Sequence, residues 1–355
     1  MHDFEIKRLG LLMEAEPGNP QEVGGVLNPA AARGPDGKLY LFPRVVGEGN
    51  YSRIGIARVR FNTNGDPCGV DRLGIALEPE ADYELQGDGR GGCEDARITY
   101  IERFGRYIMT YTALSAMIHR PLFIGSRPEE TDCDECSRMV DVEHESIWIS
   151  YCPMELDGLE PTHLGSFNSH HRLATPVEPW ESLKIGGGTP PVMARHGWMI
   201  LYHGVHATDD AEGTKKHLFY SAGVMILSKE HPRTILYRSA QPLLTPLLPH
   251  ERDGIVENVV FPTGIDCRSD IGQPDRFDIY YGMADSRIGV ASGRSAADRN
   301  RSVIAAKCPS RARHSANTNT RPGSWHDRRR YRRTIRSSGW TRLVVADVRC
   351  VWQYD

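Results

Sequence analysis

The adjacent carboxylates Glu94 and Asp95 lie in the segment GGCEDAR at residues 91–97. The glycines permit tight backbone geometry, and residues 98–101 alternate like a β-strand. We therefore expect a turn at the start of a strand, which supports whichever carboxylate points inward. Such a pair suits general acid chemistry, because burial beside a second acid keeps a carboxyl protonated near neutral pH. A solvated acidic turn is the alternative interpretation of the same residues.

The surrounding chain is rich in β-strand signals. Between residues 25 and 291, short runs of Val, Ile, Tyr, Phe and Trp alternate with Gly, Pro, Asp and Asn, without a competing amphipathic helix pattern. One pattern recurs: a turn with Gly or Asp, an aromatic residue, an apolar strand and a polar end. The copies of this pattern are residues 36–44, 104–112, 196–203 and 275–285.

Repeats at intervals of several tens of residues predict an all-β fold, a β-propeller in which each repeat belongs to one blade. Equivalent positions of the blades face one axis, so the polar ends of the repeats should meet in a central funnel. These ends are Arg44, Thr112, His203 and Asp285. A β-sandwich of alternating strands is the alternative fold.

Composition is that of a soluble globular protein. The chain has 355 residues, of which 39% are hydrophobic and 25% charged. It contains no membrane-spanning apolar run, and its first residues lack the apolar segment of a secretory signal, so we expect a cytoplasmic protein. The cysteines are irregularly spaced, which favours free thiols. The lone Cys-x-x-Cys at residues 133–136 lacks a second ligand pair, and we expect no zinc there.

Charge divides the chain into unlike parts. Residues 293–355 hold fourteen Arg and one Lys against four Asp, a net charge of +11. Since the whole chain has a net charge of −3, the preceding residues have a net charge of −14. The run RRRYRR at residues 328–333 fits a nucleic-acid contact, but apolar periodicity is missing until residue 343. We interpret residues 292–355 as a tail from a shifted reading frame, with a genuine basic arm as the alternative, and expect disorder over most of it. The expected division is an N-terminal segment 1–24, a β domain 25–291 and this tail.

The motifs of the β domain, taken together, resemble glycoside hydrolase family 130, which comprises β-mannoside phosphorylases and related mannosidases. They are EDAR at residues 94–97, WESLKIGGGTPP at 180–191, LYHGV at 201–205 and NVVFPTG at 258–264. The resemblance covers roughly residues 20–291, and the order of the motifs is more specific than any one of them. It implies a five-bladed β-propeller with the active site in the central funnel.

The resemblance also implies an activity, the cleavage of a β-mannoside by phosphate with inversion to α-mannose 1-phosphate. Asp95 matches the catalytic acid of the family, which protonates the glycosidic oxygen through a sugar hydroxyl. Inorganic phosphate is the nucleophile and co-substrate, so one protein carboxylate suffices, and neither a metal nor another cofactor is required. An inverting hydrolase instead needs a second carboxylate across the sugar, with room for water.

Matches to the family motifs assign substrate contacts as well. Phosphate requires cationic and hydrogen-bonding donors. The phosphate-binding candidates are Arg120, Lys184, His203 and Tyr220, and the mannoside-binding candidates are Asn28, Arg44, Arg53 and Asp285. Lys184 stands in an apolar, glycine-rich run, which favours function, whereas His203 fits a core histidine equally well.

Two further features of the site region have structural interpretations. Arg53 and Arg97 suit structural ion pairs as well as substrate contacts. The run of three glycines at residues 186–188 is not followed by Gly-Lys-Ser/Thr, so it is no phosphate-binding loop, and we expect tight packing near the axis instead.

The chain departs from the family at two places. Residues 111–115 pass directly into AMIHRP at 116–121, as if the first strand of a hairpin were missing, and the family usually has another phosphate-binding basic residue there. The resemblance ends near residues 290–291, so we expect the closing strands of the last blade to be absent and its edge exposed. The expected propeller therefore lacks part of one blade and is not closed at the last.

Other functions compete with phosphorolysis. They are β-mannoside hydrolysis, mannoside binding without turnover, and nucleic-acid binding by the tail. The cationic and histidine candidates favour phosphorolysis, and the acidic body argues against nucleic acid. The expected partners are a β-mannoside oligosaccharide and phosphate, with a homo-oligomer open and no membrane partner.

Overall fold

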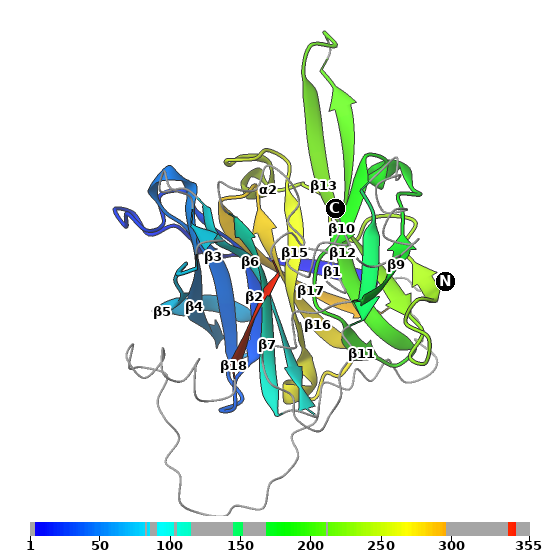
Figure 1. Cartoon of the computed structure of the whole chain (residues 1–355), viewed down its shortest axis with the longest axis horizontal. Helices are drawn as coiled ribbons and strands as arrows, with labels where there is room; N and C mark the ends of the chain where they lie inside the picture. Colours follow the sequence, from blue (N-terminus) through cyan, green and yellow to red (C-terminus); the bar gives the residue numbers. More distant parts are fainter. Residues whose placement is uncertain are drawn as a thin grey trace, which may run out of the picture.

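The chain folds as an all-β protein (Figure 1). The structure, a computed structural model, describes residues 4–81, 84–85, 91–102, 105–114, 145–151, 168–210, 212–295 and 340–345. The strands are β1 (Phe4–Glu14), β2 (Val26–Arg33), β3 (Leu39–Val46), β4 (Tyr51–Phe61), β5 (Pro67–Leu77), β6 (Gly91–Ile101), β7 (Arg106–Leu114), β8 (Ile147–Tyr151), β9 (Asn168–Ala174), β10 (Lys184–Gly187), β11 (Val192–Ala194), β12 (Gly197–Asp209), β13 (Lys216–Leu227), β14 (Ile235–Arg238), β15 (Val260–Cys267), β16 (Arg276–Met283), β17 (Arg287–Ser295) and β18 (Trp340–Val345). Short helical segments include η1 (Glu48–Asn50), η6 (Pro179–Glu181), α2 (Pro249–Arg252) and η7 (Arg268–Ile271).

Antiparallel pairing of consecutive strands builds most of the sheets. The largest has the order β18-β7-β6-β4-β3-β2, with β5 on β4; another has the order β10-β12-β13-β14, with β11 also on β12. A third has the order β1-β17-β16-β15, and β8 pairs with β9. The largest sheet joins two antiparallel units through a short parallel contact between Tyr51–Ser52 and Gly91–Gly92. The described strands thus form successive units: β2 to β5, β6 with β7, β8 with β9, β10 to β14, and β15 to β17 with β1.

The four sequence repeats occupy the same place in four of these units. They correspond to β3, β7, β12 and β16, and each pairs antiparallel with the strand before it. Two of their turns depend on glycine in the left-handed region, Gly37 with φ of 76° and Gly105 with φ of 59°. The strand prediction for these repeats is therefore confirmed.

The last unit is closed by the N-terminus, which corrects the expectation of an open edge. β1 pairs antiparallel with β17, from Phe4 opposite Ser295 to Glu14 opposite Arg287. The backbone groups of β17 are thus satisfied on both sides, by β16 and by β1. β17 also runs past residue 291, and the segment 1–24 supplies a strand to the sheet of the β domain.

Apolar clusters lie at four junctions between units, one of them between the last unit and the first. Ile147 and Ile200 belong to a cluster between the third and fourth units, and Leu201 and Ile279 to one between the fourth and fifth. The remaining clusters pack the first unit on the second and the fifth on the first. Full burial of each such aliphatic side chain is worth about 1.5–3 kcal/mol relative to exposure.

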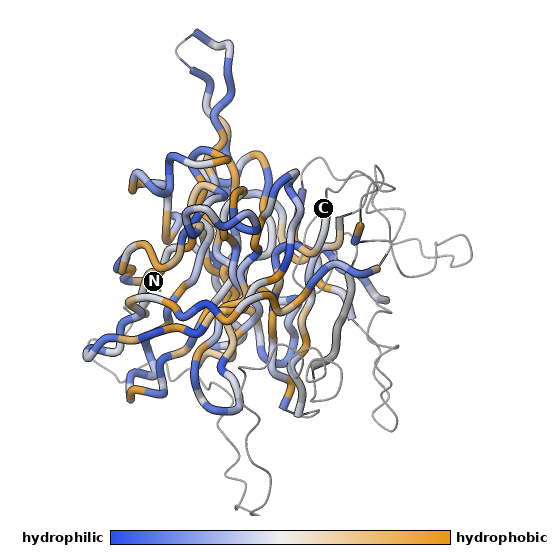
Figure 2. The backbone as a smooth tube through the Cα atoms, turned by 90° about the vertical axis from the view of Figure 1, so that its left-hand side faces the viewer, coloured by the Kyte–Doolittle hydropathy of each residue, from blue (hydrophilic) through white to orange (hydrophobic). Residues whose placement is uncertain are grey.

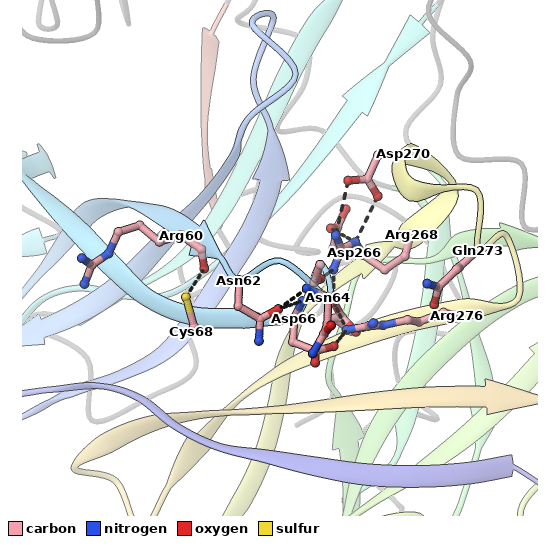
Figure 3. Close-up of polar contacts among 12 residues, drawn as sticks. Arg60, Asn62, Asn64, Asp66, Cys68, Asp266, Arg268, Asp270, Gln273 and Arg276 are labelled. Atoms are coloured by element: carbon pink, nitrogen blue, oxygen red, sulfur yellow. Dashed lines mark hydrogen bonds and ion pairs between the residues drawn. The ribbon is translucent and has the colours of Figure 1, made fainter.

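A buried ionic cluster adds a polar tie between the first and last units (Figure 3). Arg268 donates to Oδ2 of Asp278 at 2.6 Å and to the carbonyl oxygen of Gly65, in the turn between β4 and β5, at 2.6 Å. Arg276, at the start of β16, pairs with Asp66 of the same turn at 2.7 Å. The turn is thereby held to η7 and β16.

The hairpin of β12 and β13 projects beyond the rest of the molecule (Figure 1). Its projecting part is hydrophilic (Figure 2). The base of the same hairpin lies in the body, where His203 faces Ala222.

Several expectations fall largely outside the described residues. They are the missing blade segment at residues 115–121, the Cys-x-x-Cys at 133–136 and most of the tail. Within the tail, β18 pairs in parallel with β7, from Trp340 opposite Tyr107 to Val345 opposite Thr112. Cys68, Cys93 and Cys267 are free thiols, as predicted. Among the described residues, no helix has the length and apolar character needed to cross a membrane.

Candidate active site

Asp95 lies on a β-bulge inside β6. Glu94 pairs with Thr112 and Arg97 with Thr110, so Asp95 and Ala96 are left between two ladder positions. The backbone of Asp95 is left-handed, with φ of 47°. The segment is therefore a bulge within a strand and not the expected turn before one, because the ladder with β7 already begins at Gly92. Bulges of this kind re-aim side chains and are frequent beside active sites.

Asn28 occupies the matching position in β2. The register of β2 and β3 shifts between Leu27 and Ala30, and Asn28 is left-handed with φ of 45°. Its Nδ2 donates to Oδ1 of Asp95 at 3.0 Å, and its side chain is buried. Oδ1 of Asn28 is buried and has no hydrogen-bond partner among the described residues.

Arg44 brings a positive charge to the two carboxylates. Its Nη2 lies 2.6 Å from Oε1 of Glu94 and its Nη1 lies 3.9 Å from Oδ1 of Asp95. Its Nε donates to Oγ of Ser52 at 2.9 Å, and Ser52 donates to Glu94 at 3.2 Å. Ser52 was missed in the sequence, since a serine within a strand carries no signal of its own.

Asp285 completes the acidic side of the site. Burial, then the negative charge of Asp95, raises the pKa of Asp285 to about 6, against the opposing effect of Arg44. Burial also raises the pKa of Glu94, although Arg44 opposes it. Three neighbouring carboxyls with one arginine can therefore retain a proton near neutral pH. The raised pKa values that the structure shows in this group are those of Glu94 and Asp285.

Lys184, His203 and Tyr220 form a second group. Lys184 lies opposite Val205, and Val205 opposite Tyr220, in the ladders around β12. Nζ of Lys184 lies 5.9 Å from the ring centre of Tyr220, and the rings of His203 and Tyr220 are 6.0 Å apart. Nζ of Lys184 also pairs with Oε2 of Glu145 at 3.1 Å.

His203 is fully buried in this group. Burial lowers the pKa of His203 to about 3, and the positive charges of Lys184 and Arg97 act in the same direction. The imidazole is therefore neutral at pH 7 and acts through hydrogen bonds. Phe261 packs against it with ring centres 4.4 Å apart. Phe261 was missed as a site residue, although it lies in the motif at residues 258–264.

Arg97 joins the two groups. Its Nη1 donates to the carbonyl oxygen of Asp95 at 2.5 Å, and its Nε donates to the carbonyl oxygen of Gly188 at 2.6 Å. Gly188 follows β10, and a Cβ there would lie 2.6 Å from the carbonyl oxygens of both Leu201 and Pro262, which confirms the tight packing predicted for the glycine run. The guanidinium of Arg97 thus connects the strand of Asp95 with the strand of Lys184.

The other predicted site residues lie elsewhere. Nε of Arg53 donates to Oε2 of Glu78 at 2.8 Å, and its guanidinium covers the ring of Tyr51 at 4.3 Å. These contacts match the structural ion pair considered for it. Arg120 lies outside the described residues. Among the described residues, no group of three or more His, Cys, Asp or Glu side chains could hold a metal ion.

Comparison with known proteins adds independent information. The family model described as beta-1,4-mannooligosaccharide phosphorylase matches residues 137–297. The chain is 28% identical over 310 residues to a 1,2-beta-oligomannan phosphorylase of Thermoanaerobacter sp. (strain X514), covering 81% of this chain and 97% of that protein. It is 37% identical over 125 residues to a beta-1,4-mannooligosaccharide phosphorylase of Ruminococcus albus, covering 35% of each chain.

The fold also matches the solved structure of a mannoside phosphorylase. The beta-1,2-mannobiose phosphorylase of Listeria innocua, in complex with beta-1,2-mannobiose, superposes with a TM-score of 0.54 at 21% identity, over 81% of this chain and 96% of that one. Sequence motifs, family model, full-length relative and fold agree. Together they support membership of glycoside hydrolase family 130.

Proposed function

We propose that this chain cleaves β-mannosides by inverting phosphorolysis, to give α-mannose 1-phosphate and a shortened sugar. The observation that carries the proposal is the placement of an acidic group and a cationic group on either side of Arg97. An acid is needed to protonate the leaving oxygen, and cationic donors are needed to bind phosphate. The full-length relative named as a 1,2-beta-oligomannan phosphorylase supports the same reaction.

Asn28, Arg44 and Asp285 are proposed to hold the mannosyl hydroxyls. Asn28 lies beside the catalytic carboxylate, to which its Nδ2 donates at 3.0 Å, and Arg44 offers donors next to the same carboxylate. Arg53 is the weakest member of the mannoside-binding set, because Glu78 holds its guanidinium. Asp95 is proposed as the catalytic acid.

Lys184, His203 and Tyr220 are proposed to bind phosphate, together with Arg120. A neutral His203 donates or accepts a hydrogen bond without adding charge. Phosphate would have to displace or share the Glu145 carboxylate that pairs with Lys184. The lysine provides the point charge that phosphate recognition needs.

In the proposed reaction, a phosphate oxygen attacks the anomeric carbon from the face opposite the leaving group. The bond between that carbon and the glycosidic oxygen breaks as the new C–O bond forms, which inverts the centre. The proton of Asp95 passes through a sugar hydroxyl to the departing oxygen, and Asp95 regains a proton from solvent. Phosphate is the co-substrate, and the chemistry requires no further cofactor.

Hydrolysis by the same site is the less favoured function. It would need a second carboxylate positioned to activate water, whereas Lys184, His203 and Tyr220 suit an anion. Mannoside binding without turnover is distinguished by the absence of any product.

We also propose that the successive units are the blades of a five-bladed β-propeller. Apolar clusters pack the first unit on the second, the third on the fourth, the fourth on the fifth and the fifth on the first, and this order supports a ring. The site residues come from four of the five units, and Asn28 and Asp95 meet on the first strands of two neighbouring units, which suits a central funnel. A cytoplasmic location and a homo-oligomer, without nucleic-acid or membrane partners, complete the proposal.

The test is incubation of the purified chain with β-1,2- and β-1,4-linked manno-disaccharides, with and without phosphate. Mannose 1-phosphate that requires both phosphate and the Asp95 carboxyl is the expected result, with Asp95→Asn as the inactive variant. Asp71→Asn, which changes a carboxylate paired with Arg58 near the surface, is the matched control. Free mannose formed without phosphate would identify a hydrolase instead.

A further inference from the structure

Buried glutamates recur in the connections that lead into the units of the fold. Glu84, Glu181 and Glu251 have fully buried side chains. Each accepts hydrogen bonds from the backbone amides three and four residues before it. Each also accepts a hydrogen bond from a tyrosine of the unit that follows, on the strand that carries the sequence repeat (β7, β12 or β16). None of these carboxylates belongs to the proposed chemistry.

The Glu181 arrangement includes an arginine from the outer strand of the unit. The hydroxyl of Tyr202 donates to Oε2 of Glu181 at 2.9 Å, and Nη2 of Arg238 lies 2.6 Å from Oε1. Nε of Arg238 also donates to the Tyr202 hydroxyl at 3.2 Å. Three side chains from the connection, β12 and β14 thus form a closed triad.

The Glu251 arrangement repeats this design in the last unit. The hydroxyl of Tyr281 donates to Oε1 of Glu251 at 2.9 Å, and Nε of Arg8 donates to the same oxygen at 2.8 Å. Arg8 stands on β1, the outer strand supplied by the N-terminus. Burial opposes ionisation, but the hydrogen bond from Arg8, the hydrogen bonds from the backbone amides of Leu248 and Leu247 and the charge of Arg8 together outweigh it, so the pKa of Glu251 is lowered.

The tyrosine of each triad is followed directly by a residue of the site region. His203 follows Tyr202, and a Cβ on Gly204 would lie 2.4 Å from Cβ of Glu181, so the glutamate packs against the backbone beside His203. Lys184 comes three residues after Glu181 along the chain. The Glu181 triad therefore packs directly behind the group formed by Lys184, His203 and Tyr220.

The Glu251 triad lies in the same way behind Asn28 and Asp285 on the acidic side of the site. Gly282 follows Tyr281, and a Cβ there would lie 2.0 Å from Oδ1 of Asn28. Asp285 follows at the end of β16, in the left-handed region with φ of 47°. Displacement of β16 would move both the support of Asn28 and the carboxylate of Asp285.

We infer that the Glu181 triad is a positioning device for phosphate and that the Glu251 triad is a positioning device for the mannoside. The inference rests on the proposed function for the identity of the two ligands. Buried carboxylates with all their partners in place hold a strand in one position. The two triads share no residue, so the position of the phosphate-binding residues and the position of the mannoside-binding residues can be fixed independently.

Tyr202→Phe and Tyr281→Phe form the matched pair that tests this inference, because each removes one hydroxyl and retains the ring. Tyr202→Phe should raise the KM for phosphate about 3- to 10-fold and leave the KM for mannobiose within about twofold. Tyr281→Phe should instead raise the KM for mannobiose about 3- to 10-fold and leave the KM for phosphate within about twofold. Tyr40→Phe, which removes a hydroxyl bonded to Asp36 at the far end of β3, should change neither KM.

A merely structural role would have a different outcome. Both variants would then melt at lower temperature and lose active protein, with the two KM values unchanged or changed equally, and the inference would be overturned. Arg238→Lys and Arg8→Lys are a second matched pair, used if a tyrosine variant fails to fold. They retain the charge and lose the forked hydrogen bonds.

Calorimetric titration separates this inference from the proposed function. Phosphate and mannobiose are titrated separately into the wild-type chain and the variants, so that Kd replaces KM. If the wild type binds both ligands without forming mannose 1-phosphate, the proposed function fails and the Kd pattern still decides the inference. A wild type that binds neither ligand overturns both.

Discussion

Nδ2 of Asn28 donates a 3.0 Å hydrogen bond to Oδ1 of Asp95, and the two residues have left-handed φ values of 45° and 47°. Each stands at a register shift in the first strand of its own unit. Left-handed backbone at a non-glycine residue costs on the order of 1–3 kcal/mol and persists only where the surrounding structure determines it. Two neighbouring units therefore present the same distorted position to each other, which brings the proposed acid beside the proposed mannoside contact.

Asn28→Asp should move the pH dependence of catalysis. A carboxylate at this position would face Asp95 directly, and two carboxylates in one site resist full ionisation. The loss of kcat/KM at high pH should shift upward by about one pH unit. Asp tolerates left-handed backbone, so the bulge is retained. The profile of kcat/KM against pH measures the shift, and Asn50→Asp, at another left-handed asparagine, should leave the profile in place.

Asp285→Asn should alter the pH dependence of stability. The pKa of Asp285 is raised to about 6, whereas an unfolded Asp has a pKa of about 4. The folded state binds this proton more tightly, so its stabilising effect is complete below about pH 4 and is lost as the pH rises through 6. The asparagine variant, which cannot ionise, should be more stable than the wild type at pH 7 by about 1–3 kcal/mol.

Urea unfolding between pH 4 and 8 measures that difference. The advantage of the variant should disappear at the acidic end. Asp209→Asn, at the exposed end of β12, serves as the control and should show no such trend. A constant difference across the pH range would contradict the assignment to ionisation.

Arg97→Met should impair catalysis through the position of Asp95. The variant loses the hydrogen bonds to the carbonyl oxygens of Asp95 and Gly188, and a small misplacement of a reacting group can lower kcat by about 100-fold. The pKa of His203 should rise, because the charge of Arg97 contributes to lowering it. NMR titration of the imidazole checks the second effect.

Arg97→Lys separates charge from geometry. It should retain the low pKa of His203 and lose most of the activity, since an ammonium cannot reproduce the fork that joins two strands. Arg287→Met, at the start of β17 where the arginine side chain is 28% exposed, is the control and should retain activity. Full activity in Arg97→Met would refute the positioning role.

Arg268→Met should destabilise the fold. The Arg268 side chain is 1% exposed and that of Asp278 is 0% exposed, and removal of one partner from a buried ion pair costs about 3–5 kcal/mol. Urea unfolding should show this loss, whereas Arg60→Met, whose side chain is 60% exposed, should unfold like the wild type. A small effect of Arg268→Met would mean that the tie between the first and last units contributes little.

Residue order alone predicted a substantial part of this structure. The recurring turn, aromatic and apolar pattern identified β3, β7, β12 and β16, because turn chemistry and strand alternation act over a few neighbouring residues. The family motifs assigned the acid and the mannoside contacts to one set of residues, Asn28, Arg44, Asp95 and Asp285. They assigned phosphate contacts to another set, which includes Lys184, His203 and Tyr220. These residues indeed lie in two adjoining groups.

Other features depend on contacts between distant parts of the chain. The pairing of β1 with β17 uses backbone hydrogen bonds, which almost any strand sequence can make, so an open last unit was wrongly expected from the end of the resemblance. The partner of Arg53, the bridge made by Arg97 and the buried glutamate triads likewise depend on which side chains meet in space. Local patterns specify which segments become strands and turns. The register and packing of those strands decide which carboxyls lie together and which arginines are held in ion pairs, because charge and desolvation act through space and not along the chain.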